Sequence, residues 1–170
     1  MAHFNLWNWT RHLLPIAKEL GITIACDLQD VVSPDDPYRQ DFIDHAQILF
    51  FSSTNHPDPT PLIEQFLARD NIKLVIAGMG SQGCALGTQD GIRFFPPIAM
   101  DIPIIDTNGA GDGLAVGFLS SFVLDGHSLD ESIRRGQICA RYTCGQRASN
   151  SALITAEQLQ EYSRKMRADV

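Results

Sequence analysis

Seven consecutive residues in the second half of the sequence have the composition of a phosphate-binding and proton-transfer site. The run Asp106-Thr107-Asn108-Gly109-Ala110-Gly111-Asp112 follows the apolar stretch 102–105 and precedes a second apolar stretch with the character of a helix. The start of a helix leaves its first backbone N–H groups unpaired and carries the positive end of the helix dipole, so it attracts anions. Glycines at 109 and 111 would let a phosphate approach these groups without a side chain in the way.

Asp112 is the residue in this run that suggests catalysis as well as binding. A carboxylate beside a resting phosphate repels it, so its presence is explained if it takes a proton from an attacking hydroxyl group. The backbone N–H groups would then stabilise the charge on the transferred phosphoryl group. The simpler interpretation is a first-turn carboxylate that interacts favourably with the helix dipole. The order of extended segment, glycine-containing run and apolar helix favours the catalytic interpretation.

The elements that must position this run alternate between strands and helices. Short, continuous apolar runs predict strands that are covered on both faces, as in a parallel sheet. These are Ile22–Cys26, Ile48–Phe51 and Leu74–Ala77, and Ile102–Ile105 is also extended. Gly83–Thr88 and Ile92–Phe95 flank Gln89-Asp90-Gly91, which predicts an antiparallel hairpin at a sheet edge.

Helices are expected between and after these strands, from capping residues and apolar periodicity. The first runs from Thr10 to a stop at Gly21, and the second begins at Thr60, with Pro61 at the first position and Ile63, Phe66 and Leu67 buried. The third runs from Gly111 to Leu124 and is buried on most sides. The fourth runs from Ser128 to about Cys144, and the fifth begins at Thr155, with Leu159, Tyr162 and Met166 on one face. Together, these strands and helices predict a single domain over residues 1–170. Its architecture is three-layer α/β/α, with a mostly parallel sheet and an antiparallel edge hairpin.

The run at 106–112, followed by its apolar helix, closely resembles the C-terminal motif of the PfkB-type, ribokinase-like carbohydrate kinases. The resemblance implies that Asp112 is the catalytic base and that Gly109, Ala110 and Gly111 form the anion hole. It also implies a monovalent-cation site, for K⁺, near Asp106. ATP and Mg²⁺ are the implied cofactors, and a sugar or sugar-like alcohol is the implied acceptor.

A second glycine cluster, Gly78-Met79-Gly80-Ser81-Gln82-Gly83, matches the dinucleotide-binding pattern GxGxxG. That pattern requires a following helix to bind the pyrophosphate, and here a strand follows, which disfavours a dinucleotide fold. The family resemblance implies instead a loop in which Gly80, Ser81 and Gly83 contact the nucleotide phosphates. Gly78 stands where the family has a threonine.

Other positions depart from the family pattern or have two interpretations. Ser52-Ser53-Thr54-Asn55-His56 lacks the glutamate of the family's Asn-x-x-Glu motif, so Mg²⁺ would be held mainly by ATP phosphates and water. Gln137 either lies near the adenine, as the resemblance implies, or is a solvated helix residue. Arg134, Arg135, Arg141 and Arg147 either help to bind phosphates or, the favoured interpretation, form a solvated basic face.

Composition excludes several classes of protein. A net charge of −7 disfavours a non-specific nucleic-acid binder. The sequence contains neither an apolar run long enough for a membrane span nor a signal peptide. The four cysteines form no CxxC pair, which indicates reduced thiols rather than zinc binding or redox chemistry. We expect a cytoplasmic protein that binds neither nucleic acid nor membrane.

The resemblance covers only the C-terminal, nucleotide-binding half of these kinases. We therefore expect a fold that lacks the N-terminal part, with the strand Ile22–Cys26 at an open sheet edge. Such an edge predicts self-association or pairing with a separate N-terminal half. Three functions follow as alternatives: a sugar kinase that needs a missing half, a non-catalytic nucleotide-binding or structural remnant, and a related kinase acting on a nucleoside or vitamin alcohol.

Overall fold

The computed structural model describes residues 1–147 and 152–168 of the chain. The chain divides into two compact units, Met1–Pro96 and Pro97–Val170. The first unit contains the sheet and the second contains the helix that follows the glycine-containing run. No helix in the described ranges combines the length and the apolar character needed to cross a membrane.

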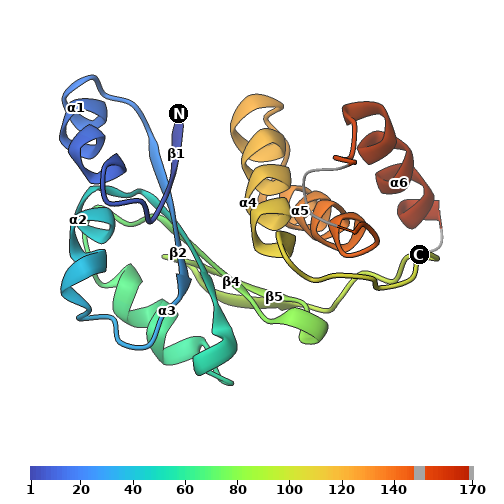
Figure 1. The fold of residues 1–170 in the computed structure, drawn as a ribbon, viewed down its shortest axis with the longest axis horizontal. Helices are drawn as coiled ribbons and strands as arrows, with labels where there is room; N and C mark the ends of the chain where they lie inside the picture. Colours follow the sequence, from blue (N-terminus) through green and yellow to red (C-terminus); the bar gives the residue numbers. More distant parts are fainter. Residues whose placement is uncertain (148–151, 169–170) are drawn as a thin grey trace. The chain divides into compact units, whose positions relative to one another are not determined.

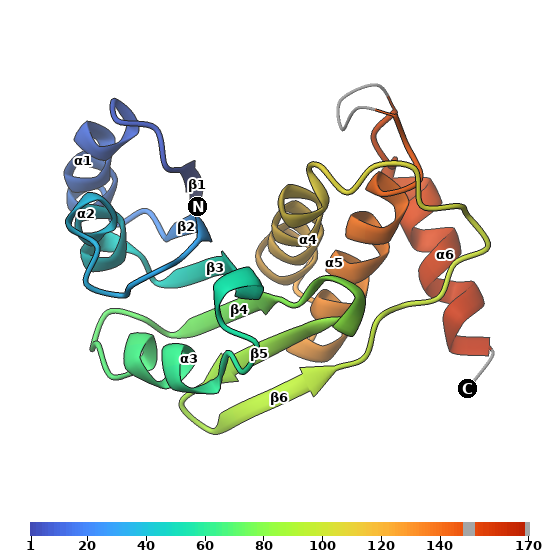
Figure 2. The same ribbon diagram turned by 60° about the horizontal axis from the view of Figure 1, so that its bottom comes forward.

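The first unit is built on a six-stranded sheet whose strands lie side by side in chain order (Figures 1 and 2). The first four strands are parallel, and the fourth, fifth and sixth pair antiparallel. The prediction of a mostly parallel sheet with an antiparallel edge hairpin is confirmed. The strands are β1 (Ala2–Asn5), β2 (Ile24–Asp30), β3 (Ile48–Ser52), β4 (Leu74–Gly78), β5 (Cys84–Thr88) and β6 (Gly91–Phe95).

β3, β4 and β5 are buried at every position except the last, and β2 is buried over its first three residues, as their continuous apolar runs predict. The first predicted strand is shifted, because β2 begins at Ile24 and continues to Asp30. The expectation that this strand forms an open edge is wrong. β1 pairs with it in parallel, with His3 beside Ala25, so β1 is the edge strand. The four residues of β1, Ala-His-Phe-Asn, contain no apolar run and gave no strand signal.

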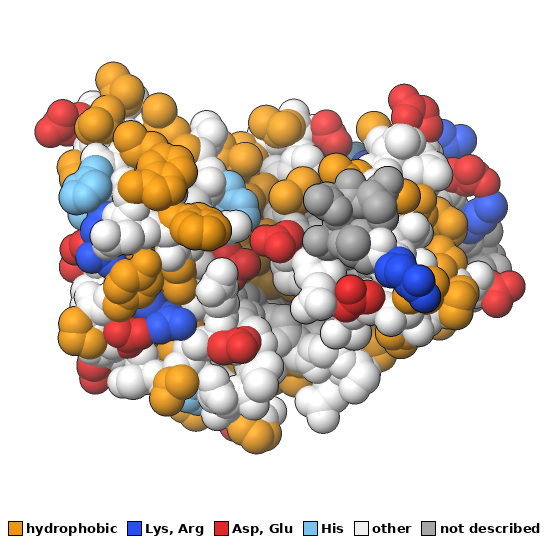
Figure 3. Space-filling view, viewed as in Figure 1, with side chains coloured by type: hydrophobic (Ala, Val, Ile, Leu, Met, Phe, Trp, Pro, Cys, Tyr) orange, Lys and Arg blue, Asp and Glu red, His pale blue; other side chains and the backbone are white. Residues whose placement is uncertain are grey.

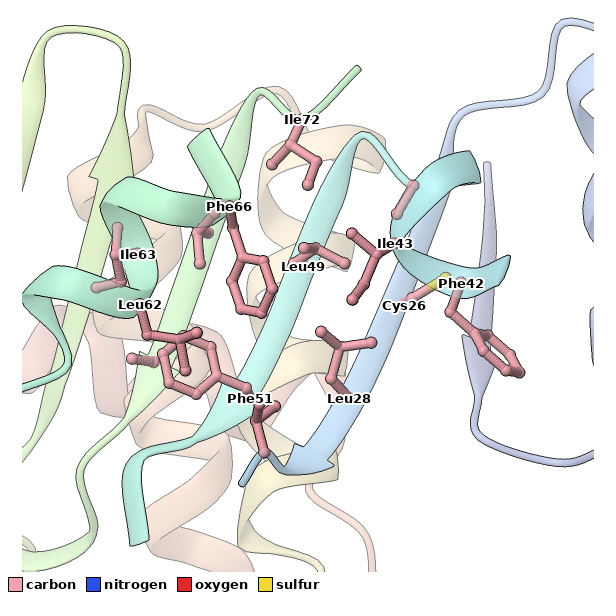
Figure 4. Close-up of a cluster of buried hydrophobic side chains, with 14 of the residues drawn as sticks. Cys26, Leu28, Phe42, Ile43, Leu49, Phe51, Leu62, Ile63, Phe66 and Ile72 are labelled. Carbon is pink, nitrogen blue, oxygen red and sulfur yellow. The ribbon is translucent and has the colours of Figure 1, made fainter. Parts of the chain in front are cut away.

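Three helices connect the parallel strands and lie on one face of the sheet (Figure 1). They are α1 (Leu14–Glu19), α2 (Pro37–His45) and α3 (Thr60–Leu67). Side chains from α2 and α3 meet those of β2 and β3 in a continuous apolar core (Figure 4). Phe66 of α3 packs edge-on against Phe51 of β3, with ring centroids 5.9 Å apart.

Several predicted helix details in this unit are corrected. Thr10 begins a 3₁₀ turn, and its hydroxyl group donates to the carbonyl groups of Asn5 and Trp7 instead of capping α1. Thr60 is the first residue of α3, and the side chain of Asp58 accepts its N–H group. α2 was not predicted at all. The Asp-Pro pair that starts it is a recognisable signal, because Asp36 caps the helix and Pro37 occupies its first position.

The second unit contains α4 (Ala110–Leu119), α5 (Leu129–Thr143) and α6 (Ala156–Ala168), and α4 continues as a π-helical turn, Ser120–Leu124. Ser128 and Thr155 cap their helices as predicted. Leu159 is buried, and Tyr162 and Met166 pack beside it. α4 is less enclosed than predicted, because the side chain of Val116 is 59% exposed.

Candidate functional site

The glycine-containing run forms a turn that leads directly into α4. Asp106 accepts the N–H group of Asn108 through its side chain, at 3.0 Å, and so fixes the start of the turn. Gly109 precedes the helix with φ 79° and ψ 1°, a left-handed conformation that a glycine adopts without strain. Gly111 has a different role. A Cβ atom placed on it would meet nothing within 4 Å, so the space above its backbone is open.

Two backbone amides at the start of α4 are free to bind an anion. The amide of Ala110 donates to the carbonyl group three residues earlier, at 3.2 Å. The first helical hydrogen bond joins the amide of Gly113 to the carbonyl group of Gly109, at 2.9 Å. Between them, the amides of Gly111 and Asp112 have no acceptor in the part of the chain that the structure describes. A phosphate oxygen fits this place, because the amides are unbonded and the space is open.

Asp112 lies in the first turn of α4 with its side chain exposed to solvent. Its carboxylate is therefore accessible to a ligand that binds the same turn. It is the third residue of α4, and its own amide is one of the two that have no acceptor. The geometry permits both predicted interpretations of Asp112, as a base and as a partner of the helix dipole.

Close packing between α4 and α5 sets the position of this turn. Small residues bring the two backbones together: a Cβ atom on Gly117 would lie 2.7 Å from Sγ of Cys139, and one on Gly136 would lie 2.7 Å from the carbonyl oxygen of Leu114. Separations this short leave no room for a side chain. Glycine at these positions therefore allows α4, the helix that follows the glycine-containing run, to pack closely against α5.

The carbonyl group of Cys144, at the end of α5, holds the entry to the turn. It accepts the N–H groups of Ile105 at 2.8 Å and Asp106 at 3.2 Å. The predicted extended segment Ile102–Ile105 is consequently tied to a helix end, and it pairs with no strand in the described part of the chain. Nothing in the sequence pattern indicated this contact.

Three of the predicted nucleotide-binding residues, Gly80, Ser81 and Gly83, lie in the first unit, in the loop between β4 and β5. Gly80, Ser81 and the residue after them form a 3₁₀ turn, and Gly80 and Gly83 have positive φ angles of 56° and 96°. The amide of Met79 donates to the carbonyl group of Gly83, at 2.9 Å, and closes the loop. Ser81 is exposed and the space above Gly80 is open. As predicted, a strand rather than a helix follows, which agrees with the rejection of a dinucleotide fold.

The segment that replaces the Asn-x-x-Glu motif forms a short turn after β3. The hydroxyl groups of Ser52 and Thr54 are hydrogen-bonded, at 2.7 Å. The side chains of Asn55 and His56 both contact the carbonyl oxygen of Val31, at 3.3 Å and 3.1 Å. These side chains therefore hold the chain together near the end of β2. Among the described residues there is no group of three His, Cys, Asp or Glu side chains suited to a metal ion.

The predicted solvated basic face on α5 is wrong for two of its arginines. Arg135 is 5% exposed and donates to Oγ of Ser121 at 2.8 Å and to Oε1 of Gln160 at 2.9 Å. Arg141 donates to backbone carbonyl groups of the segment before the turn. Gln137 is 8% exposed, so its interpretation as a solvated helix residue is also wrong.

The structure thus groups the predicted residues in two places. The turn at the start of α4 brings together Asp106, Gly109, Ala110, Gly111 and Asp112, and Gln137 lies on α5, which packs against α4. The loop after β4 brings together Gly80, Ser81 and Gly83. The two places belong to different compact units.

Comparisons with known proteins identify relatives of this chain. Residues 36–156 match the model of the pfkB family carbohydrate kinases. The chain is 26% identical over 146 residues to acarbose 7(IV)-phosphotransferase of Actinoplanes sp., covering 85% of this chain and 48% of the relative. It is 27% identical over 143 residues to fructoselysine 6-kinase of Escherichia coli, covering 84% of this chain and 53% of the relative. The chain spans about half the length of the curated relatives it matches.

Solved structures confirm the predicted ribokinase-like α/β fold. A microbiome-derived acarbose kinase matches 95% of this chain with a TM-score of 0.86 and 26% identity, and the match covers 55% of that protein. Ribokinase from Thermotoga maritima matches 89% of this chain with a TM-score of 0.73. At 18% identity, the second likeness concerns the fold alone.

Proposed function

Because this chain belongs to the PfkB family of carbohydrate kinases, we propose that it serves ATP-dependent phosphorylation of a sugar or sugar-like alcohol. The observation that carries the proposal is the start of α4, where the free amides of Gly111 and Asp112 lie beside an exposed carboxylate. The names of the relatives, an acarbose phosphotransferase and a fructoselysine kinase, support a carbohydrate derivative as the acceptor.

In the proposed reaction, Asp112 removes the proton from the acceptor hydroxyl group. The hydroxyl oxygen forms a bond to the γ-phosphorus of ATP, the bond from that phosphorus to the bridging oxygen breaks, and ADP leaves. The free amides of Gly111 and Asp112 stabilise the charge on the transferred group. Of the other predicted members of the anion hole, Ala110 already donates its amide to the carbonyl group of Thr107, and Gly109 gives the turn its left-handed conformation. Mg²⁺, when bound through phosphates and water, neutralises part of the phosphate charge.

Further roles are proposed for residues outside this turn. Gly80, Ser81 and Gly83 would contact the nucleotide phosphates, which the open space above Gly80 and the exposure of Ser81 support. Gln137 would lie near the adenine, and its burial in α5 fits a residue that lines an enclosed surface. Asp106 would contribute to a K⁺ site, although its carboxylate already accepts the amide of Asn108.

A second candidate function is nucleotide binding without catalysis. Gly78 replaces the family's threonine, and the side chains of Asn55 and His56 are occupied with the carbonyl group of Val31. Both departures concern the phosphate and Mg²⁺ side of the reaction. They leave the anion site at the start of α4 intact.

Calorimetric titration with Mg·ATP, on the natural chain and Asp112→Asn, separates these functions from a purely structural role. We expect both proteins to bind, because the amides supply the affinity. ADP release in the presence of acarbose, fructoselysine, fructose or ribose then tests catalysis, and the variant should lose about 10²–10⁴-fold of any turnover. Absence of binding at millimolar ATP would refute both functions. Binding without turnover would favour the second.

We also propose that a polypeptide supplying the rest of the kinase fold packs against β1 and α1. The matched acarbose kinase structure contains nearly as much chain again as the matched part. β1 is a parallel edge strand, to which a further parallel strand can be added. Hydrophobic side chains gather over the region of α1 and β1 (Figure 3). Around α1 and the turn before it, four exposed apolar side chains follow helix spacing and form an apolar stripe: Trp9, Leu13, Ile16 and Leu20, with exposed fractions of 64%, 41%, 52% and 70%.

A further inference from the structure

One guanidinium group holds the segment that leads into the predicted catalytic turn. Nη2 of Arg141, near the end of α5, donates to the carbonyl oxygen of Met100 at 3.3 Å and also to that of Ile102. Both acceptors lie a few residues before Asp106. A guanidinium is planar and presents its donors in fixed directions, so these bonds tie the segment to one turn of the helix.

The same end of α5 contacts the segment at two further points. The carbonyl group of Cys144 accepts the amides of Ile105 and Asp106. Gly145 lies so close that a Cβ atom on it would be 2.3 Å from Cγ2 of Ile102. Backbone hydrogen bonds to Cys144 therefore hold the end of the segment nearest the turn, and the guanidinium, together with the close approach of Gly145 to Ile102, holds the more distant end.

The hydrogen bonds of Arg141 are concentrated on this segment. Its Nη1 atom is shut off from solvent and has no hydrogen-bond partner among residues 1–147 and 152–168. A buried donor without a partner costs stability, which offsets part of what the Nη2 bonds contribute. Replacing this side chain should therefore disturb the segment more than it disturbs the stability of the unit.

We propose that Arg141 is a positioning residue for the phosphate site at the start of α4. The inference rests on the proposed function. Free amides bind an anion most strongly when they are fixed before the ligand arrives. Asp106 starts the turn that ends at Gly109, so movement of segment 100–106 would displace the amides of Gly111 and Asp112. Arg141 prevents this movement through its hydrogen bonds to the backbone of the segment.

The test compares Arg141→Gln and Arg141→Lys with the control Arg135→Gln. Amide hydrogen exchange at Ile105 and Asp106 reports the position of the segment without any ligand, and calorimetry reports Mg·ATP affinity. We expect Arg141→Gln to exchange faster at both amides and to bind about 10-fold more weakly, a loss of about 1.4 kcal/mol. Arg141→Lys keeps one donor and should recover part of both losses.

Arg135→Gln separates general destabilisation from positioning. Arg135 is buried and bonded to Ser121 and Gln160, so its loss should lower the unfolding midpoint. It should leave exchange at 105 and 106 unchanged. Unchanged amide exchange at 105 and 106 in Arg141→Gln would refute the proposal that Arg141 holds the segment. Faster exchange with unchanged Mg·ATP affinity would refute the role of Arg141 in nucleotide binding. Failure of the natural chain to bind Mg·ATP would refute the proposed function itself, and with it the purpose assigned to Arg141.

Discussion

Two glycines of the predicted anion turn, residues 106–112, have different physical roles that the sequence pattern does not distinguish. Gly109 has a positive φ angle, which costs other residues roughly 1–2 kcal/mol. Gly111 is the second residue of α4 and faces open space. The first glycine is required by the backbone conformation, and the second keeps the approach to the amides clear. Substitution should separate the two roles.

Gly111→Ala should leave the free energy of unfolding unchanged or raise it slightly, because alanine is the better helix former and meets no neighbour. The added methyl group lies over the free amide, so Mg·ATP affinity should fall. Gly109→Ala should instead lose roughly 1–2 kcal/mol of stability. Urea unfolding and calorimetry measure the two effects. Equal ATP affinity in Gly111→Ala and the natural chain would contradict the assignment of this turn to phosphate.

Cys144 provides a chemical reporter beside the turn. Burial raises the pKa of its thiol, the Asp106 carboxylate raises it further, and the Arg141 guanidinium opposes this effect. The other three cysteines are more deeply buried, and burial raises the thiol pKa of Cys139 to about 11 and that of Cys84 to about 12. Alkylation by iodoacetamide should therefore be slow at neutral pH, rise with pH, and occur first at Cys144.

Potassium ions should accelerate this alkylation if Asp106 belongs to a cation site. A bound cation would offset the carboxylate charge and lower the pKa of the neighbouring thiol, which increases the thiolate fraction at a given pH. The comparison is KCl against choline chloride at equal ionic strength, with Cys144→Ser to identify the reacting group. Equal rates in the two salts would count against the K⁺ role of Asp106.

At the scale of elements, the glycine contacts between α4 and α5 determine where the predicted anion site lies. Gly117→Ala should destabilise the protein by about 1–3 kcal/mol, because its Cβ atom would lie 2.7 Å from Sγ of Cys139 and 2.9 Å from Cα of Gly136. Thermal and urea unfolding measure the loss. Gly111→Ala, the same chemical change at an open position of the same helix, is the matched control. A loss of similar size in both variants would show that close packing is not the cause.

The start of α2 should contribute to stability in a pH-dependent way. The hydrogen bond from the amide of Tyr38 is the main cause that lowers the pKa of Asp36, and Arg39 lowers it further. A carboxyl group whose pKa is lower in the folded state stabilises the protein above its unfolded pKa, near 4, and loses this contribution as the pH falls through its folded pKa. Asp36→Asn keeps a capping side chain and should show a smaller decrease in stability between pH 5 and about 3. An identical decrease in both proteins would refute this contribution.

At the scale of the whole molecule, the sheet has one parallel edge, β1, and the apolar stripe of residues 9–20 lies on and around α1. If this surface packs against the remainder of a kinase fold, the chain alone should not remain a clean monomer. Light scattering coupled to size exclusion should detect self-association, which Ile16→Glu should reduce because it places a charge in the stripe. Glu19→Gln, an exposed change on the same helix, is the control. A stable monomer at all concentrations would contradict the partner proposal.

The sequence determined the class of the fold because its strong signals are local. Continuous apolar runs indicated β2 to β4, a short polar turn indicated the β5–β6 hairpin, and capping side chains at Ser128 and Thr155 indicated α5 and α6. The run 106–112 could be recognised for the same reason, since an anion site at a helix start is made by consecutive residues. β1 was missed because its four residues lack an apolar pattern, and they become a strand only through pairing with β2.

Only the tertiary structure decided what holds the anion turn in place. Arg141 and the carbonyl group of Cys144 lie far along the chain from the segment they bind, and backbone acceptors leave no mark on the amino-acid pattern. The burial of Arg135 and Gln137 was likewise invisible, because a polar residue on an amphipathic helix reveals neither its neighbours nor its solvent exposure. The sequence thus determined which residues could perform the chemistry. The packing of α5 against α4 and the preceding segment decided how they are held.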